Sequence, residues 1–184
     1  VGKKYSALAL HRELERRDIK TTFRATGQTG IMIAGEGIPI DSVVADFISG
    51  AAEVLSPDND ADHWDVIEGQ GSLFHASFSG VTAGLIHGSQ ADALVLCHEP
   101  TREHMRGLPT YPLPDLKTCM ELNLTMARIT NPDVKFVGIS VNTSQLSETE
   151  AAEYLAKVEA EFNLPAVDPF REGVSRIVEA LAKI

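Results

Sequence analysis

The sequence predicts an α/β fold, a three-layer sandwich in which a mostly parallel sheet carries helices on both faces. Along the 184 residues, short apolar stretches of strand length alternate with longer stretches of helical character. Residues 93–97 and 135–141 form apolar runs, which are typical of parallel strands covered on both faces. Elements that alternate in this way build a parallel sheet flanked by helices.

Helices are expected where apolar residues recur at helical spacing or where a start signal is present. Asp41 is a candidate N-cap for one helix, and Ser147 with Glu150 forms a capping box at the start of another. The expected helices are residues 3–17, 41–55, 81–87, 115–129, 147–162 and 172–184.

Strands and loops fill the remaining segments. The expected strands are residues 19–25, 63–68, 93–97, 135–141 and 165–168. The segment 26–37 is Gly-rich and contains an apolar patch. The segment 107–114 holds three prolines and is expected to be a loop. Ligands of such sheets bind beyond the carboxyl ends of the strands, where the Gly-rich and His/Glu-rich segments of this chain fall.

Composition excludes several classes of partner. The formal net charge is −10, which disfavours both non-specific nucleic-acid binding and an anionic membrane surface. No apolar run approaches the roughly 20 residues that a membrane-spanning helix needs. The two cysteines, Cys97 and Cys119, favour a reducing cytoplasm over a disulfide framework or a zinc site.

The first four residues, Val1 to Lys4, match the second half of a phosphate-binding loop. Gly2-Lys3 before a helix corresponds to the end of G-x-x-x-x-G-K-[ST], whose amides and lysine surround phosphates. Lys4 stands where a Ser or Thr would hold Mg²⁺. The pair of lysines therefore favours an anion that arrives without a metal, such as the phosphates of coenzyme A, and no metal site is expected. The remainder of the loop is expected to precede Val1.

A second polar segment follows the strand at 63–68. Glu68 ends this strand and is followed by Gly69, Gln70 and Gly71. A carboxylate in this position faces the phosphate loop in P-loop proteins, where it can hold a metal or act as a general base. The alternative is a tight glycine turn with a solvated glutamate. Nearby Ser72 and His75 add polar groups and weigh against that alternative.

Two further strand ends carry candidate binding residues. Arg24, with Thr26 and Gln28 after it, is a candidate clamp for a carboxylate or phosphate, or else an ion pair at the sheet edge. His98 and Arg102 follow the strand at 93–97, and His98 next to a glutamate forms a candidate acid/base pair. A loop histidine without a catalytic role is the alternative.

Four segments together resemble a known family. These are GKKYSALAL (2–10), TFRATGQTGIMIAGEGIPID (22–41), VIEGQGSLFHASFSGVTAGLIHGSQADALVLCHEPTR (66–102) and GISVNTSQL (138–146). They look like the C-terminal P-loop domain of the D-glutamate N-acetyltransferase family. More distantly, the Gly-Lys helix and the Glu68 strand are similar to dethiobiotin synthetase. The resemblance covers nearly the whole chain and implies a P-loop NTPase-like fold over residues 1–184, with a smaller N-terminal domain in a longer protein.

The resemblance implies acetyl transfer from acetyl-CoA to the amino group of D-glutamate. The chemistry needs an anion site, a base for the ammonium and donors for the thioester oxyanion. Gly2, Lys3 and Lys4 are available to bind coenzyme A, and Gly69, Gln70 and Gly71 to bind the cofactor and the oxyanion. The base would be Glu68, His75 or His98. The residues available to bind the substrate are Arg24, Thr26, Gln28, Ser72 and Arg102.

Two other readings stay open. One is a Mg-ATP-dependent ligase or kinase of the dethiobiotin synthetase type, with Glu68 on Mg²⁺ and Lys3 on phosphate. The other is a nucleotide-binding module without chemistry. Under every reading the expected ligand is a small molecule, and a homo-oligomer in the cytoplasm is expected.

Overall fold

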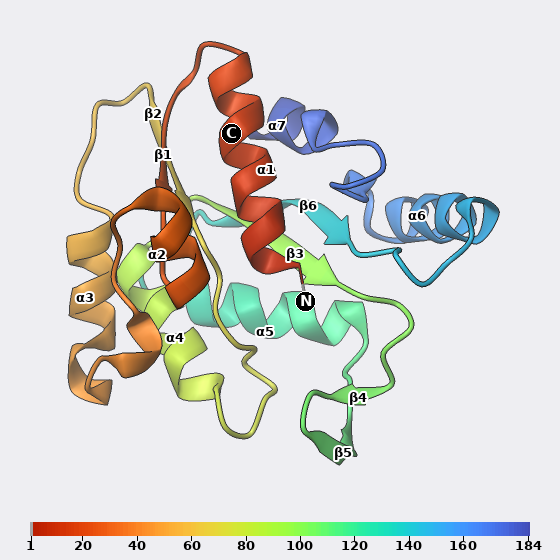
Figure 1. Ribbon diagram of the computed structural model, residues 1–184, viewed down its shortest axis with the longest axis horizontal. Coiled ribbons are helices and arrows are strands. Elements are labelled where there is room, and N and C mark those ends of the chain that lie inside the picture. Colours follow the sequence, from red (N-terminus) through yellow and green to blue (C-terminus); the bar gives the residue numbers. More distant parts are fainter. Residues whose placement is uncertain (1) are drawn as a thin grey trace.

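The computed structural model describes residues 2–184, so Val1 of the expected phosphate loop lies outside the described residues. Helices and strands alternate as the sequence predicts (Figure 1). The helices are α1 (Lys3–Arg16), α2 (Gln28–Ala34), α3 (Ile48–Leu55), α4 (Ser79–Ser89), α5 (Leu116–Ala127), α6 (Glu148–Phe162) and α7 (Ser175–Leu181). The strands are β1 (Lys20–Arg24), β2 (His63–Ile67), β3 (Ala93–His98), β4 (His104–Met105), β5 (Leu108–Pro112), β6 (Lys135–Val141) and β7 (Ala166–Val167).

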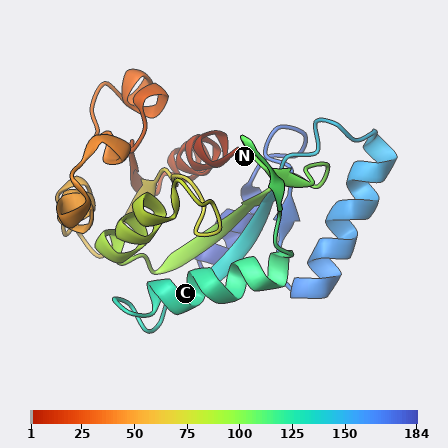
Figure 2. The same cartoon turned by 90° about the horizontal axis from the view of Figure 1, so that it is seen from below.

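The main strands are all paired in parallel. β1 pairs with β2, and β3 pairs with β6, which pairs in turn with β7. β4 and β5 form a separate antiparallel hairpin. Helices cover both faces of the parallel strands, with α1 and α7 on one face and α5 on the other (Figure 2). The predicted three-layer α/β class is confirmed.

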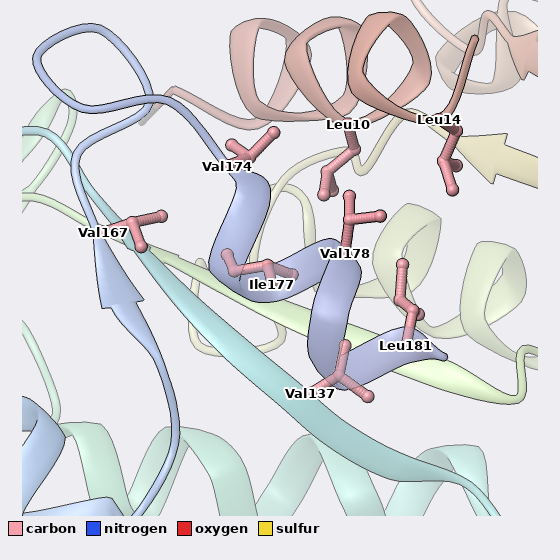
Figure 3. Close-up of a cluster of buried hydrophobic side chains, with 8 residues drawn as sticks. All are labelled: Leu10, Leu14, Val137, Val167, Val174, Ile177, Val178 and Leu181. Carbon is pink, nitrogen blue, oxygen red and sulfur yellow. The ribbon is translucent and has the colours of Figure 1, made fainter. Parts of the chain in front are cut away.

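The largest core cluster lies between α1, α7 and the sheet (Figure 3). Leu10 and Leu14 of α1 pack against Ile177 and Val178 of α7, above Val137 of β6. Ile177 is fully buried, and truncation of such a side chain to alanine costs about 2–5 kcal/mol. This cluster fixes α1, and with it Gly2 and Lys3, over the carboxyl ends of the strands.

The Gly-rich segment 26–37, for which the sequence predicts neither a helix nor a strand, is partly helical. It contains α2, which begins where a buried carboxylate accepts main-chain N–H groups and ends at Gly35 in the left-handed conformation, with φ 80°. A C-terminal glycine in a Gly-rich stretch therefore ends a short helix here.

The helix expected at 41–55 is wrong in its first half. Two 3₁₀ turns, Ile40–Ser42 and Ala45–Phe47, precede α3, and Asp41 lies inside the first turn and caps no helix. Between the two turns, Val43 and Val44 adopt extended ψ angles of 139° and 135°. Consecutive β-branched residues favour that extended backbone over a helix.

Two smaller differences lie nearer the C-terminus. The segment 107–114, expected to be a loop, contains β5 and, with Gly107 at φ 76°, part of the turn that joins β5 to β4 in the hairpin. The last helix begins at Ser175 because Gly173, at φ 79°, interrupts the helical backbone. Among residues 2–184, none of the helices combines the length and the apolar character needed to cross a membrane.

Candidate functional site

The candidate site begins at the N-terminus of α1. Gly2 adopts a left-handed conformation with φ 79° and ψ −8°, which glycine tolerates and other residues resist. Its carbonyl oxygen accepts the Ser6 N–H at 2.9 Å. Among the described residues, no side chain caps α1 and its first turn contains no acidic residue. Its free N–H groups and the positive end of its dipole are therefore available to an anion.

Lys3 extends from this turn to the carboxyl ends of β2 and β3. Its side chain lies against Gly69, where an added Cβ atom would be 3.0 Å from Lys3 Cδ. Burial lowers the pKa of the Lys3 ammonium below its usual value. Cys97 and Glu68 oppose this shift, and Arg102 adds to it. A partly desolvated ammonium at the positive end of a helix is stabilised by an anionic ligand.

Glu68 is buried, and its carboxylate holds the start of α2. Oε2 accepts the main-chain N–H groups of Thr26 and Gly27, both at 3.1 Å. The Thr26 hydroxyl donates to the Glu68 carbonyl oxygen at 2.6 Å and accepts from the Gln70 amide at 3.0 Å. A Cβ atom on Gly30 would overlap Oε2, so the carboxylate needs glycine at this position. The alternative of a solvated Glu68 is wrong, because only 5% of its surface is exposed.

His75 joins the loop after β2 to the β4–β5 hairpin. The Ser77 N–H donates to Nδ1 at 3.1 Å, so Nε2 carries the proton and donates to the Arg106 carbonyl at 3.0 Å. The ring also packs against Phe78, with centroids 4.5 Å apart. Both ring nitrogens are therefore occupied, and neither is free to take a proton from a ligand in this arrangement.

His98 lies at the carboxyl end of β3, in a cavity with a volume of about 480 Å³ between β3, the start of α5 and α6. Its Nε2 lies 2.9 Å from the Tyr154 hydroxyl. Burial lowers the pKa of His98 to about 4, with Arg102 contributing. The imidazole is therefore neutral at pH 7. Lys157 and Glu161 also line this cavity, which places both signs of charge around it.

Arg24 occupies a different face of the sheet. Its Nε lies 2.9 Å from Asp65 Oδ1 on β2, and Asp65 Oδ2 accepts the Ser56 hydroxyl at 2.8 Å. Phe23 and Ala25, on either side of Arg24, pack towards Ala7 of α1, so Arg24 points to the α3 side. The structure therefore does not bring Arg24 to Lys3. It forms the ion pair that the sequence left open as its alternative.

The other predicted residues lie around these groups. Gln28 is exposed as the first residue of α2, and Lys4 is half-buried on the first turn of α1. The Ser72 hydroxyl accepts the Phe74 N–H at 3.2 Å and thereby shapes the loop after β2. Gly71, at φ 50°, packs where a Cβ atom would approach Thr82 Oγ1 to 2.7 Å. Within residues 2–184, no group of three or more His, Cys, Asp or Glu side chains is arranged to hold a metal ion.

Sequence reasoning missed Tyr154 and Lys157. The capping box at Ser147 predicts their helix but not which helix face meets β3. The two residues stand three positions apart and so share a face of α6. The three-residue spacing of Tyr154 and Lys157, on the helix that follows β6 and hence lies next to β3, is the signal that could have identified them.

These features define a class of protein. A glycine-lysine turn begins a helix above the carboxyl ends of a parallel sheet, which is the arrangement of P-loop α/β domains. The chain belongs to the family described as "Domain of unknown function (DUF1611_C) P-loop domain", which matches residues 1–178.

Similar proteins have been named or solved. The chain is 60% identical over 184 residues to a D-glutamate N-acetyltransferase of Tritonibacter scottomollicae, and 54% identical over 181 residues to one of Pseudoalteromonas sp.. These matches cover 100% and 98% of this chain but 55% and 54% of the relatives. A crystal structure of a DUF1611 family protein from Anabaena variabilis superposes with a TM-score of 0.92 at 38% identity, covering 100% of this chain and 54% of that one. The chain thus spans about half the length of the curated relatives that it matches.

Proposed function

We propose that this domain binds acetyl-CoA and, within the whole protein, helps transfer its acetyl group to the amino group of D-glutamate. The names of two relatives above half identity support this reaction and favour it over a Mg-ATP-dependent one. The observation that carries the proposal is Lys3, a partly desolvated ammonium at the uncapped N-terminus of α1.

The phosphates of coenzyme A fit the α1 N-terminus. A helix N-terminus offers free N–H groups and positive partial charge, and Lys3 adds a full charge next to them. Lys4 on the same turn supplies a second cation in place of the hydroxyl that would hold Mg²⁺. Phosphates bound in this way need no metal to balance their charge.

The cavity beside His98 suits the acceptor amino acid. D-glutamate carries two carboxylates and one ammonium group, and the cavity offers cations at Arg102 and Lys157 with carboxylates at Glu103, Asp115 and Glu161. The Arg102 Nε is 3.9 Å from Glu99 Oε2, a loose pair that leaves the guanidinium available. A volume of about 480 Å³ lies within the range of small-molecule sites.

The His98–Tyr154 pair is the proposed proton acceptor. The neutral imidazole takes a proton from the substrate ammonium, directly or through the Tyr154 hydroxyl bound to its Nε2. The amine nitrogen then attacks the thioester carbonyl, the new C–N bond forms and the C–S bond breaks. The leaving thiolate takes the remaining proton that the nitrogen must lose, so that coenzyme A departs as its thiol. Glu68 and His75 hold the surrounding loops, because their polar atoms are already bonded to main-chain groups.

The main test is steady-state thiol release by the full-length protein with acetyl-CoA and D-glutamate. His98→Asn should lower kcat/KM by about 10²–10⁴-fold, the usual range for loss of a general base. His104→Asn is the matched control, because His104 is exposed on β4 and should leave the rate unchanged. A wild-type rate for His98→Asn would remove His98 from the mechanism.

A second comparison separates acetyl transfer from the Mg-ATP alternative. A thermal shift with acetyl-CoA in the absence of metal supports the proposal. A shift only with Mg-ATP contradicts it.

Assembly and location complete the proposal. The exposed apolar side chains Met32, Phe47 and Val54 lie on or next to α2 and α3 and favour a contact with a further domain or with a second subunit. Cys97 and Cys119 are free thiols, which supports a reducing cytoplasm. Size-exclusion chromatography with light scattering on the full-length protein tests the oligomer.

A further inference from the structure

The β4–β5 hairpin, residues 103–113, forms one wall of the cavity beside His98. It projects between the end of β3 and the start of α5 (Figure 1). The Leu113 N–H donates to the Glu103 carbonyl at 3.0 Å across the base of the hairpin. Both of these residues line the cavity, and so does Arg102, which immediately precedes the hairpin. The position of the hairpin therefore decides the shape of the cavity.

Few contacts hold the hairpin in place. Within residues 2–184, β4 and β5 pair with each other and with no other strand, and Met105 is the one buried residue between positions 104 and 112. In the same part of the chain, a single hydrogen bond joins the hairpin to the rest of the domain, from His75 Nε2 to the Arg106 carbonyl at 3.0 Å. A two-stranded hairpin is marginally stable in water by itself, so this bond contributes strongly to keeping it against the domain.

His75 is itself fixed in its loop. Its N–H donates to the Ser72 carbonyl at 3.1 Å, and its own carbonyl accepts the N–H groups of Phe78 and Ser79. The ring is held as well, because Nδ1 accepts the Ser77 N–H and one ring face packs against Phe78. A donor that is already ordered loses little conformational entropy when it bonds. His75 therefore acts as a rigid anchor for the mobile side of the contact.

We infer that His75 is the positioning residue for the amino-acid substrate: it holds the hairpin against the cavity and thereby sets the affinity for that substrate without touching it. The inference rests on the proposed function, in which the cavity binds D-glutamate. Without the anchor, the cavity is complete for only part of the time, and the apparent affinity falls by that fraction. Binding of coenzyme A at the α1 N-terminus does not use the hairpin and should not change.

Two variants of His75 separate the bond to the hairpin from the bond within the loop. In His75→Asn, the amide oxygen lies near the position of Nδ1 and keeps an acceptor for the Ser77 N–H, but the donor to the Arg106 carbonyl is lost. In His75→Gln, the longer side chain brings an amide N–H near the position of Nε2 and keeps that donor. Gly107→Ala disturbs the contact from the hairpin side, because alanine is strained at φ 76°, and its Cβ atom meets open space and leaves the core intact.

Steady-state acetyl transfer by the full-length protein measures the consequence for the substrate. His75→Asn and Gly107→Ala should raise KM for D-glutamate about tenfold, with kcat and KM for acetyl-CoA within about twofold of the wild type. His75→Gln should restore KM to within about threefold. His104→Asn, the same change at an exposed position of the hairpin, should match the wild type. An unchanged KM for D-glutamate in His75→Asn, or a loss confined to kcat, would overturn the inference.

Amide hydrogen exchange without substrate measures the hold on the hairpin directly. The Leu113 amide should exchange about tenfold faster in His75→Asn than in the wild type and at nearly the wild-type rate in His75→Gln. The Ile139 amide, which donates to the Pro165 carbonyl inside the sheet, should not change. A wild-type protein that fails to acetylate D-glutamate would contradict the proposed function. Equal Leu113 exchange in the wild type and His75→Asn would instead overturn the role of His75 itself.

Discussion

Replacing Glu68 with glutamine separates a structural from a catalytic role for this carboxylate. Glutamine keeps an oxygen that can accept from Thr26 and Gly27 but removes the charge. Hydrogen bonds to charged groups contribute about 1 kcal/mol more than neutral ones. With two such bonds, the free energy of unfolding should fall by about 2 kcal/mol. Glu68→Ala leaves both N–H groups without a partner and should cost about 4 kcal/mol.

Urea unfolding and thiol release on the full-length protein measure both effects. Glu53→Gln, the same change at an exposed site on α3, should alter the stability by no more than about 0.5 kcal/mol. Because Glu68 is expected to anchor α2, Glu68→Gln should keep kcat/KM within tenfold of the wild type. A loss above about 10³-fold with unchanged stability would refute this reasoning and restore Glu68 as the general base.

Three further predictions concern stability. Asp168→Asn should cost about 2–3 kcal/mol at pH 7, since this buried carboxylate accepts several main-chain N–H groups. Although burial opposes the shift, these hydrogen bonds hold the pKa of Asp168 below its usual 3.8. The ionised Asp168 carboxylate therefore adds to the free energy of unfolding above that pH, and this stabilisation is lost on acidification. Urea titrations at pH 3–7 should show a weaker acid dependence in the variant. Gly88→Ala would drive the new Cβ atom into the Ser49 carbonyl and should lower the free energy of unfolding by about 2–3 kcal/mol. Gly80→Ala on the same helix meets open space and should raise it by about 0.5–1 kcal/mol. Thermal unfolding of the two variants measures both changes. Because burial lowers the pKa of His98 to about 4, folding should lose stability as the pH falls from about 6.5 to 4, and His98→Asn should reduce that loss in the same titrations.

The sequence predicts the strands and long helices because local signals agree with tertiary burial there. The Ser147 capping box starts α6 as expected, with the Glu150 carboxylate accepting the Ser147 N–H at 2.9 Å. The start of α2 could not be predicted because Glu68, whose carboxylate accepts the N–H groups of Thr26 and Gly27 just before the helix, is distant in sequence. The break before α3 could have been suspected from Val43-Val44 alone.

The sequence predicts which site residues stand at the carboxyl ends of strands, but not which of them contact one another. Lys3, Glu68 and Arg102 do converge, because parallel strands deliver their carboxyl ends to one edge. Arg24 does not join them, because side chains alternate along a strand and the odd and even positions of β1 face opposite layers. A shift of one residue along β1 would place Arg24 on the opposite face of the sheet. A sequence pattern predicts which residues lie on which face only where one face is clearly apolar.

The most direct measurement of the central claim is a calorimetric titration of coenzyme A, without metal, into the full-length protein and its Lys3→Ala variant. Loss of a charge-assisted contact of about 1.5–3 kcal/mol predicts a Kd roughly 10–100-fold higher for the variant. Lys117→Ala, which removes an exposed lysine from α5, should bind as the wild type does. An unchanged Kd for Lys3→Ala would contradict the assignment of the α1 N-terminus as the coenzyme A site.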